Sequence, residues 1–235
     1  MRVLGIESST VAASTALVED GALLGEVWLA TPANHSQKLL GAVARLMELS
    51  ATSAENLDGV AVGLGPGSFT GVRVALSTAK GLAFGLGIPL VGIPTLEALA
   101  AGVSHCQHLV CPMVDARGER VFTGLFRIGQ GSIQKVREEG LRELVPWVLG
   151  LNEPVLFVGD GAIAYRQLIQ NFLGDLAKFV PVEYSLPRAS SVARLGEGRL
   201  RRGDKDDIDL LAPRYAQEAK AVRDMACSGE SPVAR

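Results

Sequence analysis

The stretch from Gly63 to Gly71, GLGPGSFTG, constrains the fold of this chain more than any other feature. Four of its nine residues are glycine. Residues 57–62 before it predict a short buried strand, and residues 72–85 after it predict a helix. A glycine-rich turn from strand to helix can point backbone N–H groups at an anion, or it can let two backbone segments pack tightly together. The sequence leaves both interpretations open.

The two best-known phosphate loops do not fit this stretch. A Walker loop closes with Lys-Ser or Lys-Thr, and no lysine follows Gly67 in the segment Ser68 to Arg73. A dinucleotide fingerprint needs Gly-x-Gly-x-x-Gly, and the run from Gly65 to Gly71 has one residue too many. A nonstandard anion site therefore stands beside a simpler hypothesis, in which a tight turn begins a helix with Ser68 or Thr70 near its cap.

The composition is that of a globular protein. The chain has 235 residues, 48% hydrophobic and 20% charged, and a net charge of −2, which gives no general attraction to nucleic acid or membranes. No apolar run approaches the roughly 20 residues that cross a bilayer, no signal peptide is visible, and the three cysteines are sparse. These features predict a cytoplasmic protein without a membrane segment.

The order of apolar segments is the same in both halves of the chain. Three strands joined by hairpins precede alternating helices and strands, which predicts two similar α/β units with mixed sheets. We expect an N-terminal subdomain over 1–104, a C-terminal subdomain over 105–223 and a loose tail over 224–235. The expected strands are 3–8, 12–19, 23–30, 60–64, 90–93, 109–115, 120–128, 131–136, 154–159 and 179–182. The expected helices are 35–50, 72–85, 94–101, 141–148, 162–172 and 190–202.

Two turns carry residues that could perform chemistry. In the first hairpin, an acid followed by small hydroxyl residues could hold a metal–phosphate group, although a plain turn has the same composition. The candidate nucleotide or anion contacts are Glu7, Ser8, Ser9, Thr10, Gly65 and Gly67. The segment from Asp115 to Arg120 has the charges of an acid–base site, and we favour a solvated turn. The histidines form no metal-binding pair, and the sequence identifies neither metal ligands nor catalytic residues.

The predicted helix after the glycine turn is almost uncharged. Between Val72 and Leu86 its only charges are Arg73 and Lys80. A helix that is apolar nearly all round is buried on more than one side. One side must face the sheet, and the other could face the helix over 35–50 or another protein.

Several of these motifs together resemble the TsaB family, also called YeaZ. The motifs occur in the family's order and cover roughly residues 1–215: Ile6–Thr10, Gly65–Arg73, Pro94–Leu99, Asp115–Glu119 and Pro213–Tyr215. The resemblance implies two ribonuclease H-like subdomains of the actin-like, sugar kinase and Hsp70 group. It also implies a part in forming N6-threonylcarbamoyladenosine on tRNA, as partner and activator of TsaD.

The resemblance further implies a protein without catalysis of its own. TsaD carries a metal on a His-x-x-x-His motif, and the matching positions here are Thr95 and Leu99, which cannot bind a metal as imidazole does. We expect no cofactor in the chain itself, ATP or ADP at the interface of the complex, TsaE as a further partner, tRNA bound through the complex, and a homodimer when TsaD is absent. The alternative is an independent nucleotide hydrolase or M22-type glycoprotease.

In the family, the two helices matching 35–50 and 70–85 pack against their counterparts in TsaD. Carried over to this sequence, the expected partner interface consists of His35, Leu39, Val43, Leu46, Phe69, Val72, Arg73, Leu76, Ala79, Lys80 and Ala83.

Overall fold

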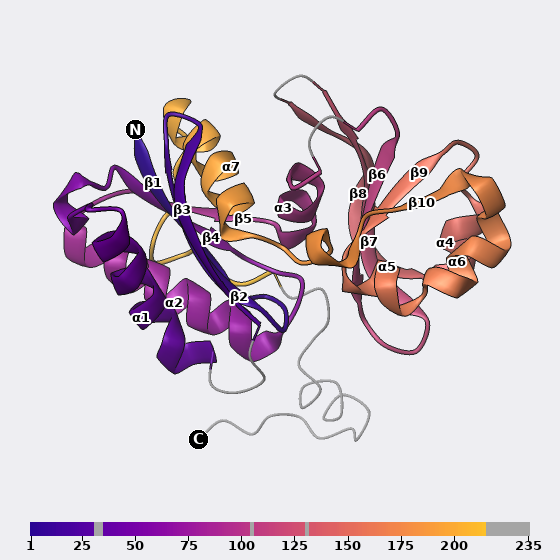
Figure 1. Cartoon of the computed structure of the whole chain (residues 1–235), viewed down its shortest axis with the longest axis horizontal. Helices are drawn as coiled ribbons and strands as arrows, with labels where there is room; N and C mark the ends of the chain where they lie inside the picture. Colours follow the sequence, from indigo (N-terminus) through magenta and orange to yellow (C-terminus); the bar gives the residue numbers. More distant parts are fainter. Residues whose placement is uncertain (31–34, 104–105, 130–131, 215–235) are drawn as a thin grey trace.

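The computed structural model describes residues 1–30, 35–103, 106–129 and 132–214, and the side chains of 35–37 lie outside this description. The tail predicted over 224–235 also lies outside the described residues. The described part contains two five-stranded mixed sheets with helices packed on them (Figure 1).

The first sheet is built from the first half of the chain. Its order is β3-β2-β1-β4-β5. The strands β1, β2 and β3 form an antiparallel meander, and β4 and β5 continue parallel to β1. Their bounds are β1 (Arg2–Glu7), β2 (Ala13–Glu19), β3 (Ala22–Leu29), β4 (Gly59–Gly63) and β5 (Leu90–Ile93).

The second sheet repeats this arrangement in the second half. Its order is β10-β9-β6-β7-β8, with β6, β7 and β8 antiparallel and β9 and β10 parallel to β6. Its strands are β6 (Leu109–Asp115), β7 (Arg120–Ile128), β8 (Ile133–Glu143), β9 (Val155–Val158) and β10 (Ala177–Phe179). Two α/β subdomains with the same mixed strand order confirm the predicted ribonuclease H-like class.

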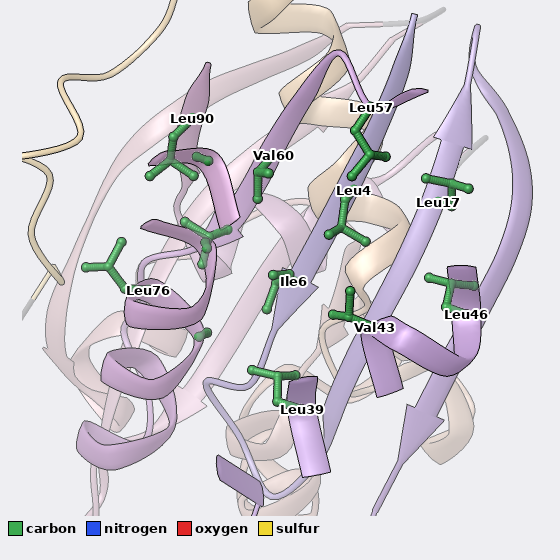
Figure 2. Packing of buried hydrophobic residues seen from close by; sticks show 14 of the residues in the cluster. Leu4, Ile6, Leu17, Leu39, Val43, Leu46, Leu57, Val60, Leu76 and Leu90 are labelled. Carbon is green, nitrogen blue, oxygen red and sulfur yellow. The ribbon is translucent and has the colours of Figure 1, made fainter. Parts of the chain in front are cut away.

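Alternating side chains divide the core of the first sheet between its two faces. Leu4 and Ile6 of β1 pack under α1 (His35–Leu49) and α2 (Phe69–Leu86), as Figure 2 shows. Val3 points to the other face, where it meets α7 (Ala189–Arg201). Gly5 lies on this face too, because a Cβ there would overlap the backbone of Ala189. Small residues therefore bring α7 close to the central strand.

Two helices cross between the halves of the chain. Helix α3 (Thr95–Ala101) follows the last strand of the first sheet, yet its Leu96 and Leu99 pack with the second sheet. Helix α7 comes at the end of the second half and covers β1, β2 and β4 of the first sheet. Both lie between the two sheets in Figure 1. The first sheet ends with β5 and the second begins with β6, but α3 and α7 each pack against the sheet of the other half of the chain.

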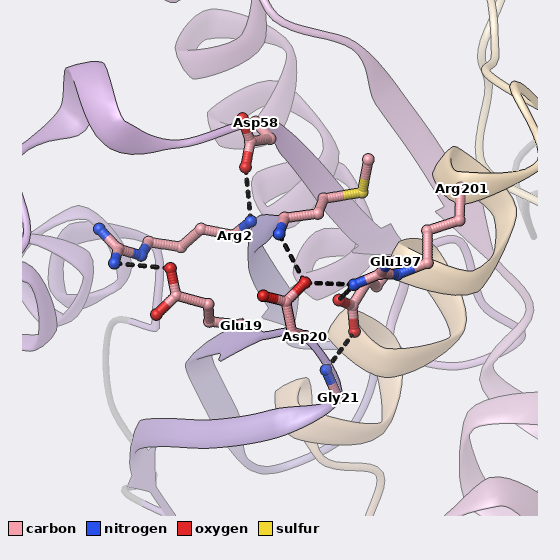
Figure 3. A network of polar contacts seen from close by, with 8 residues as sticks. Arg2, Glu19, Asp20, Gly21, Asp58, Glu197 and Arg201 are labelled. Carbon is pink, nitrogen blue, oxygen red and sulfur yellow. Dashed lines mark hydrogen bonds and ion pairs between the residues drawn. The ribbon is translucent and has the colours of Figure 1, made fainter.

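A polar network fastens α7 to the first sheet (Figure 3). Glu197 accepts hydrogen bonds from the backbone of Gly21 at 2.9 Å and from the Arg201 guanidinium at 2.8 Å. Arg201 also forms an ion pair with Asp20 in the β2–β3 turn. These contacts fix the orientation of α7 across the turn, while the apolar contacts beneath it supply most of the burial energy.

The outer helices of the second subdomain depart from the sequence-based expectation. The helix expected over 141–148 begins only at α4 (Leu144–Leu149), because residues 141–143 pair with β7 as the end of a long β8. The helix expected over 162–172 is split into α5 (Asp160–Ala164) and α6 (Arg166–Leu173). The strand expected over 179–182 ends at Phe179, before Pro181, which has no N–H to donate to a ladder.

Candidate functional site

The glycine loop packs directly against the first hairpin. A Cβ on Gly67 would overlap the carbonyl of Ser9, and a Cβ on Gly71 would overlap the carbonyl of Ser8. The Ser68 backbone N–H donates to the Ser9 carbonyl at 2.6 Å, and the Ser8 hydroxyl donates to the Gly71 carbonyl at 2.7 Å. The glycines therefore permit close backbone packing, the second of the two interpretations that the sequence left open.

The start of α2 has the cap that the simpler hypothesis requires. Ser68 is the N-cap residue, and its hydroxyl accepts a hydrogen bond from the Gly71 N–H at 3.2 Å. Phe69, the first residue of the helix, is exposed, and the Arg73 guanidinium lies 3.6 Å from the centre of its ring. The turn thus begins the helix and presents an aromatic side chain to solvent.

The hydroxyls and amides of the first hairpin are used inside the chain. Glu7, Ser8, Ser9 and Thr10 are all buried. The Ser9 N–H donates to Glu7 Oε1 at 2.5 Å, and the Thr95 hydroxyl donates to Ser9 Oγ at 3.1 Å. An incoming phosphate at Ser8 and Ser9 would have to displace these contacts.

Glu7 is a fully buried acid with one unsatisfied oxygen. Its Oε2 has no hydrogen-bond partner within the described residues. Burial raises the pKa of Glu7, against the opposing effect of the hydrogen bonds from Ser9 and Ser8. Burial thus shifts this carboxyl group toward its protonated form, whereas a carboxylate that binds a metal must be ionised.

Gly65 and its neighbours connect the loop to α3. Gly65 has a φ of +93°, a backbone conformation that residues other than glycine rarely adopt. The Gly65 carbonyl accepts a hydrogen bond from the Thr95 N–H at 2.9 Å. Thr95 and Leu99 are both buried, Thr95 against Ser9 and Leu99 in the core of the second sheet. These two positions serve packing. Across the described part of the chain, no three His, Cys, Asp or Glu side chains are arranged to hold a metal ion.

Most of the expected partner interface lies inside the chain. Seven of its side chains are buried, in the packing between α1, α2 and the sheet: Leu39, Val43, Leu46, Val72, Leu76, Ala79 and Ala83. They cannot contact a partner without unpacking the core, so this part of the expectation needs correction. The apolar stripe of a helix that covers a sheet faces that sheet, and the opposite face is the one left for a partner.

The remaining expected interface residues lie at the edges of this packing. Phe69 and Arg73 are exposed at the start of α2, and Lys80 donates to the Asp209 carbonyl at 3.3 Å. The side chain of His35 lies outside the described residues.

The outward face of α1 and α2 carries apolar side chains that the sequence analysis missed. Phe84 is 81% exposed and Leu40 is 56% exposed. A Cβ added to Gly41, Gly81 or Gly85 would meet open space, so these helix surfaces are bare backbone. The i, i+4 spacing of Gly81 and Gly85 places both on one face and could have identified it from sequence. Phe84 beside these glycines gives an apolar surface that another helix could approach closely.

The second hairpin forms a polar cluster with a residue that the sequence analysis did not select. Asp115 Oδ1 accepts from the Arg117 N–H at 2.8 Å and from the Tyr165 hydroxyl at 2.9 Å. The same hydroxyl accepts from the Glu119 N–H at 3.2 Å. The Asp160 carboxylate accepts a hydrogen bond from the Asp115 N–H at 3.1 Å. Tyr165, at the break between α5 and α6, ties the turn to the helices.

A cavity of about 480 Å³ lies at the carboxyl ends of β4 and β5, and none of the site residues selected from the sequence lines it. Its walls include Leu64, Glu97, Lys135 and Arg214, which come from four separate parts of the chain. No local sequence signal could have joined them.

None of the described helices has the length and apolar character that crossing a membrane requires.

The comparison with known proteins agrees with this architecture. Residues 29–224 match the family model for TsaD, tRNA N6-adenosine threonylcarbamoyltransferase. A tRNA threonylcarbamoyladenosine biosynthesis protein TsaB from Bacillus subtilis is 32% identical over 94% of this chain and 96% of its own length. The Escherichia coli protein of the same name is 36% identical over 57% of this chain and 58% of its own length.

A solved structure extends the match to three dimensions. YeaZ from Pseudomonas aeruginosa superimposes with a TM-score of 0.78 and 28% sequence identity, covering 91% of this chain and 99% of that one. Sequence similarity over nearly the whole length and the same two-sheet architecture lead to one conclusion: the chain belongs to the TsaB (YeaZ) family.

Proposed function

We propose that this chain acts in the formation of N6-threonylcarbamoyladenosine on tRNA, as a non-catalytic partner that binds and activates a TsaD-type protein. The names of its TsaB relatives support the pathway. The observation that carries the partner role is the exposed apolar face of α1 and α2, with Phe84 81% exposed beside the open glycines Gly81 and Gly85.

This face suits a helical partner. Bare glycine backbone on α2 lets a second helix approach closely, and Phe84 and Leu40 offer large apolar side chains to bury. The same face would form a homodimer when TsaD is absent, since an exposed apolar surface of this kind can be covered by its own copy. TsaE, and tRNA held through the complex, complete the proposed set of partners, with ATP or ADP at the interface of the complex and a cytoplasmic location.

The non-catalytic role is supported by the polar groups of the first hairpin and the glycine loop, because they form hydrogen bonds within the chain. The amides and hydroxyls of Ser8, Ser9 and Ser68 bond within the chain, and Thr95 and Leu99 offer no metal-binding nitrogen. The rival function is an independent nucleotide hydrolase or glycoprotease. It would require Glu7 and the loop to open.

The partner role can be tested by mixing the chain with the TsaD-type protein of the same cell. Light scattering should give a 1:1 complex, and Phe84→Glu should abolish it while circular dichroism shows an intact fold. Leu149→Glu is the matched control, because Leu149 is also exposed but lies on α4 of the other subdomain. A Phe84→Glu variant that binds as well as the original chain would contradict the proposed surface.

Activation needs its own measurement. Formation of threonylcarbamoyladenosine on tRNA by the TsaD-type protein should rise when this chain is added, and Phe84→Glu should remove the increase. Turnover of ATP or of a peptide by the isolated chain would instead favour the rival function.

A further inference from the structure

The cavity of about 480 Å³ occupies a position where α/β sheets commonly bind ligands. It opens at the carboxyl ends of β4 and β5, beside Leu64 and Ile93, and ligands of open α/β sheets bind outside this end of the parallel strands. The neighbouring crevice between β1 and β4 is filled by Glu7 lying against Gly63. The cavity is therefore an open space next to the crevice that Glu7 fills. Its volume is in the range of small-molecule sites.

Some of the charged side chains around the cavity form its wall, because they bond to one another and to the backbone. Arg199 binds Asp204 at 2.8 Å and Asp206 at 3.0 Å. Asp206 also accepts from the Gly92 N–H at 2.7 Å, and its own N–H donates to the Leu90 carbonyl at 3.0 Å. These bonds hold the segment after α7 along the free edge of β5. The wall is thus rigid on this side.

Lys135, Arg214 and Glu97 also face the cavity, and both cations interact electrostatically with Glu139 nearby. Lys135 of β8 forms only long ion pairs, at 3.5 Å with Glu138 and 3.8 Å with Glu139. Within the described residues, no hydrogen bond or ion pair joins the guanidinium of Arg214 or the carboxylate of Glu97 to another side chain. The Arg214 N–H donates to the Leu64 carbonyl at 2.8 Å, which fixes its backbone at the rim.

A smaller cavity of about 240 Å³ shares Lys135 and Arg214 with the larger one. The two cations therefore stand between two hollows, and each hollow also has apolar walls. In the larger cavity these are Leu64, Ile93, Pro94 and Leu211. A ligand that fits would carry an anionic group for the cations, hydrogen-bond donors for Glu97, and a flat apolar part.

We propose that the larger cavity binds a ribonucleoside monophosphate. Its phosphate would be held by Lys135 and Arg214, because guanidinium and ammonium groups are the side chains that suit phosphate oxygens. A ribose hydroxyl would donate to Glu97, and the base would lie against the apolar wall around Leu64 and Ile93. This site belongs to the chain alone and goes beyond the proposed partner role, since it does not require TsaD.

Calorimetry on the full chain tests the proposal with four probes: AMP, 2′-deoxy-AMP, adenosine and inorganic phosphate. AMP should bind, and adenosine and phosphate should each bind at least about tenfold more weakly, because each makes only part of the contacts. Lys135→Ala and Arg214→Ala should each weaken AMP binding by about tenfold or more. Arg127→Ala, an exposed arginine on β7 outside both cavities, is the matched control and should leave binding unchanged.

The ribose contact has a separate readout. In the original chain AMP should bind more tightly than 2′-deoxy-AMP, and Glu97→Ala should reduce that difference. Thermal unfolding checks that each variant folds. The proposal is overturned if no saturable AMP binding occurs up to about 10 mM, a range that covers even weak ligands. It is equally overturned if phosphate binds as tightly as AMP, or if Lys135→Ala and Arg214→Ala bind AMP like the control.

Discussion

The carboxyl group of Glu7 lies against the α-carbon of Gly63 so closely that a Cβ on residue 63 would overlap Oε2. Glu7 ends β1 and Gly63 ends the neighbouring β4, so the pair closes the crevice between two parallel strands. Gly63 is the first glycine of the loop, and it provides room for a buried acid.

This burial predicts a pH dependence that one substitution removes. The pKa of Glu7 is raised from an ordinary value of 4.5, chiefly by burial, so folding favours its neutral form. Its contribution to stability is present below the unfolded pKa and is lost as pH rises toward the folded pKa. Relative to Glu7→Gln, the original chain should therefore lose stability as pH rises above about 4.5, and the difference should level off above the folded pKa.

Urea unfolding of both chains from about pH 4 to about pH 8 measures this difference. Gln keeps the side-chain oxygen that accepts from Ser9, so the comparison isolates the ionisation of Glu7. A free-energy difference that stays constant over this range would show that Glu7 does not change its pKa on folding.

Two glycines of α2 should respond to alanine in opposite directions. Gly71→Ala would drive a Cβ into the Ser8 carbonyl, and overpacking of this kind costs about 1–3 kcal/mol of the unfolding free energy. Gly81→Ala, in the same helix, meets open space and should add about 0.5–1 kcal/mol, because alanine favours the helix more than glycine does. Denaturant unfolding checks both, and equal effects would contradict the close packing at Gly71.

Ala83→Glu should unfold the chain and not simply weaken a partner interface. Ala83 is fully buried against the first sheet, and a carboxylate there has no partner, which costs a few kcal/mol. Ser77→Glu is the control, because Ser77 is exposed on the same helix and should change stability by less than about 0.5 kcal/mol. Circular dichroism melts decide the matter, and an Ala83→Glu variant as stable as Ser77→Glu would place Ala83 at the surface.

The thiol of Cys111 should resist alkylation in the folded chain. Burial raises its pKa to about 11, against hydrogen bonds with Thr123 and Trp147, so little thiolate exists near neutral pH. In a chain with Cys106 and Cys227 replaced by serine, iodoacetamide should react at least about 100-fold more slowly with the folded than with the unfolded protein. Equal rates, followed by mass spectrometry, would contradict this burial.

The fold was largely predictable because its signals are local. The apolar run of β1 and the hairpin that joins β2 to β3 depend on neighbouring residues, and both are seen in the structure. The end of β8 was not predictable, because Leu141 pairs with Phe122 of β7 and long-range pairing overrides the local helical pattern.

The site was less predictable because its residues meet only after folding. The role of the glycine loop depends on Ser8 and Ser9, which lie about sixty residues earlier and which no spacing rule connects to Gly67 or Gly71. The expected interface followed the apolar stripe of α1, including Leu39, and such a stripe identifies the buried face of a helix. A partner surface consists of the exposed residues on the opposite face of the helix, such as Leu40.

The position of α7 also bears on how the chain is made. Synthesis proceeds from the N-terminus, so β1, β2 and β4 leave the ribosome long before the helix that covers their second face. Val3 and Ala61 stay without that cover until residues 189–201 emerge. Contacts between segments so far apart in sequence form late, so the growing chain exposes this apolar face of the first sheet until α7 arrives.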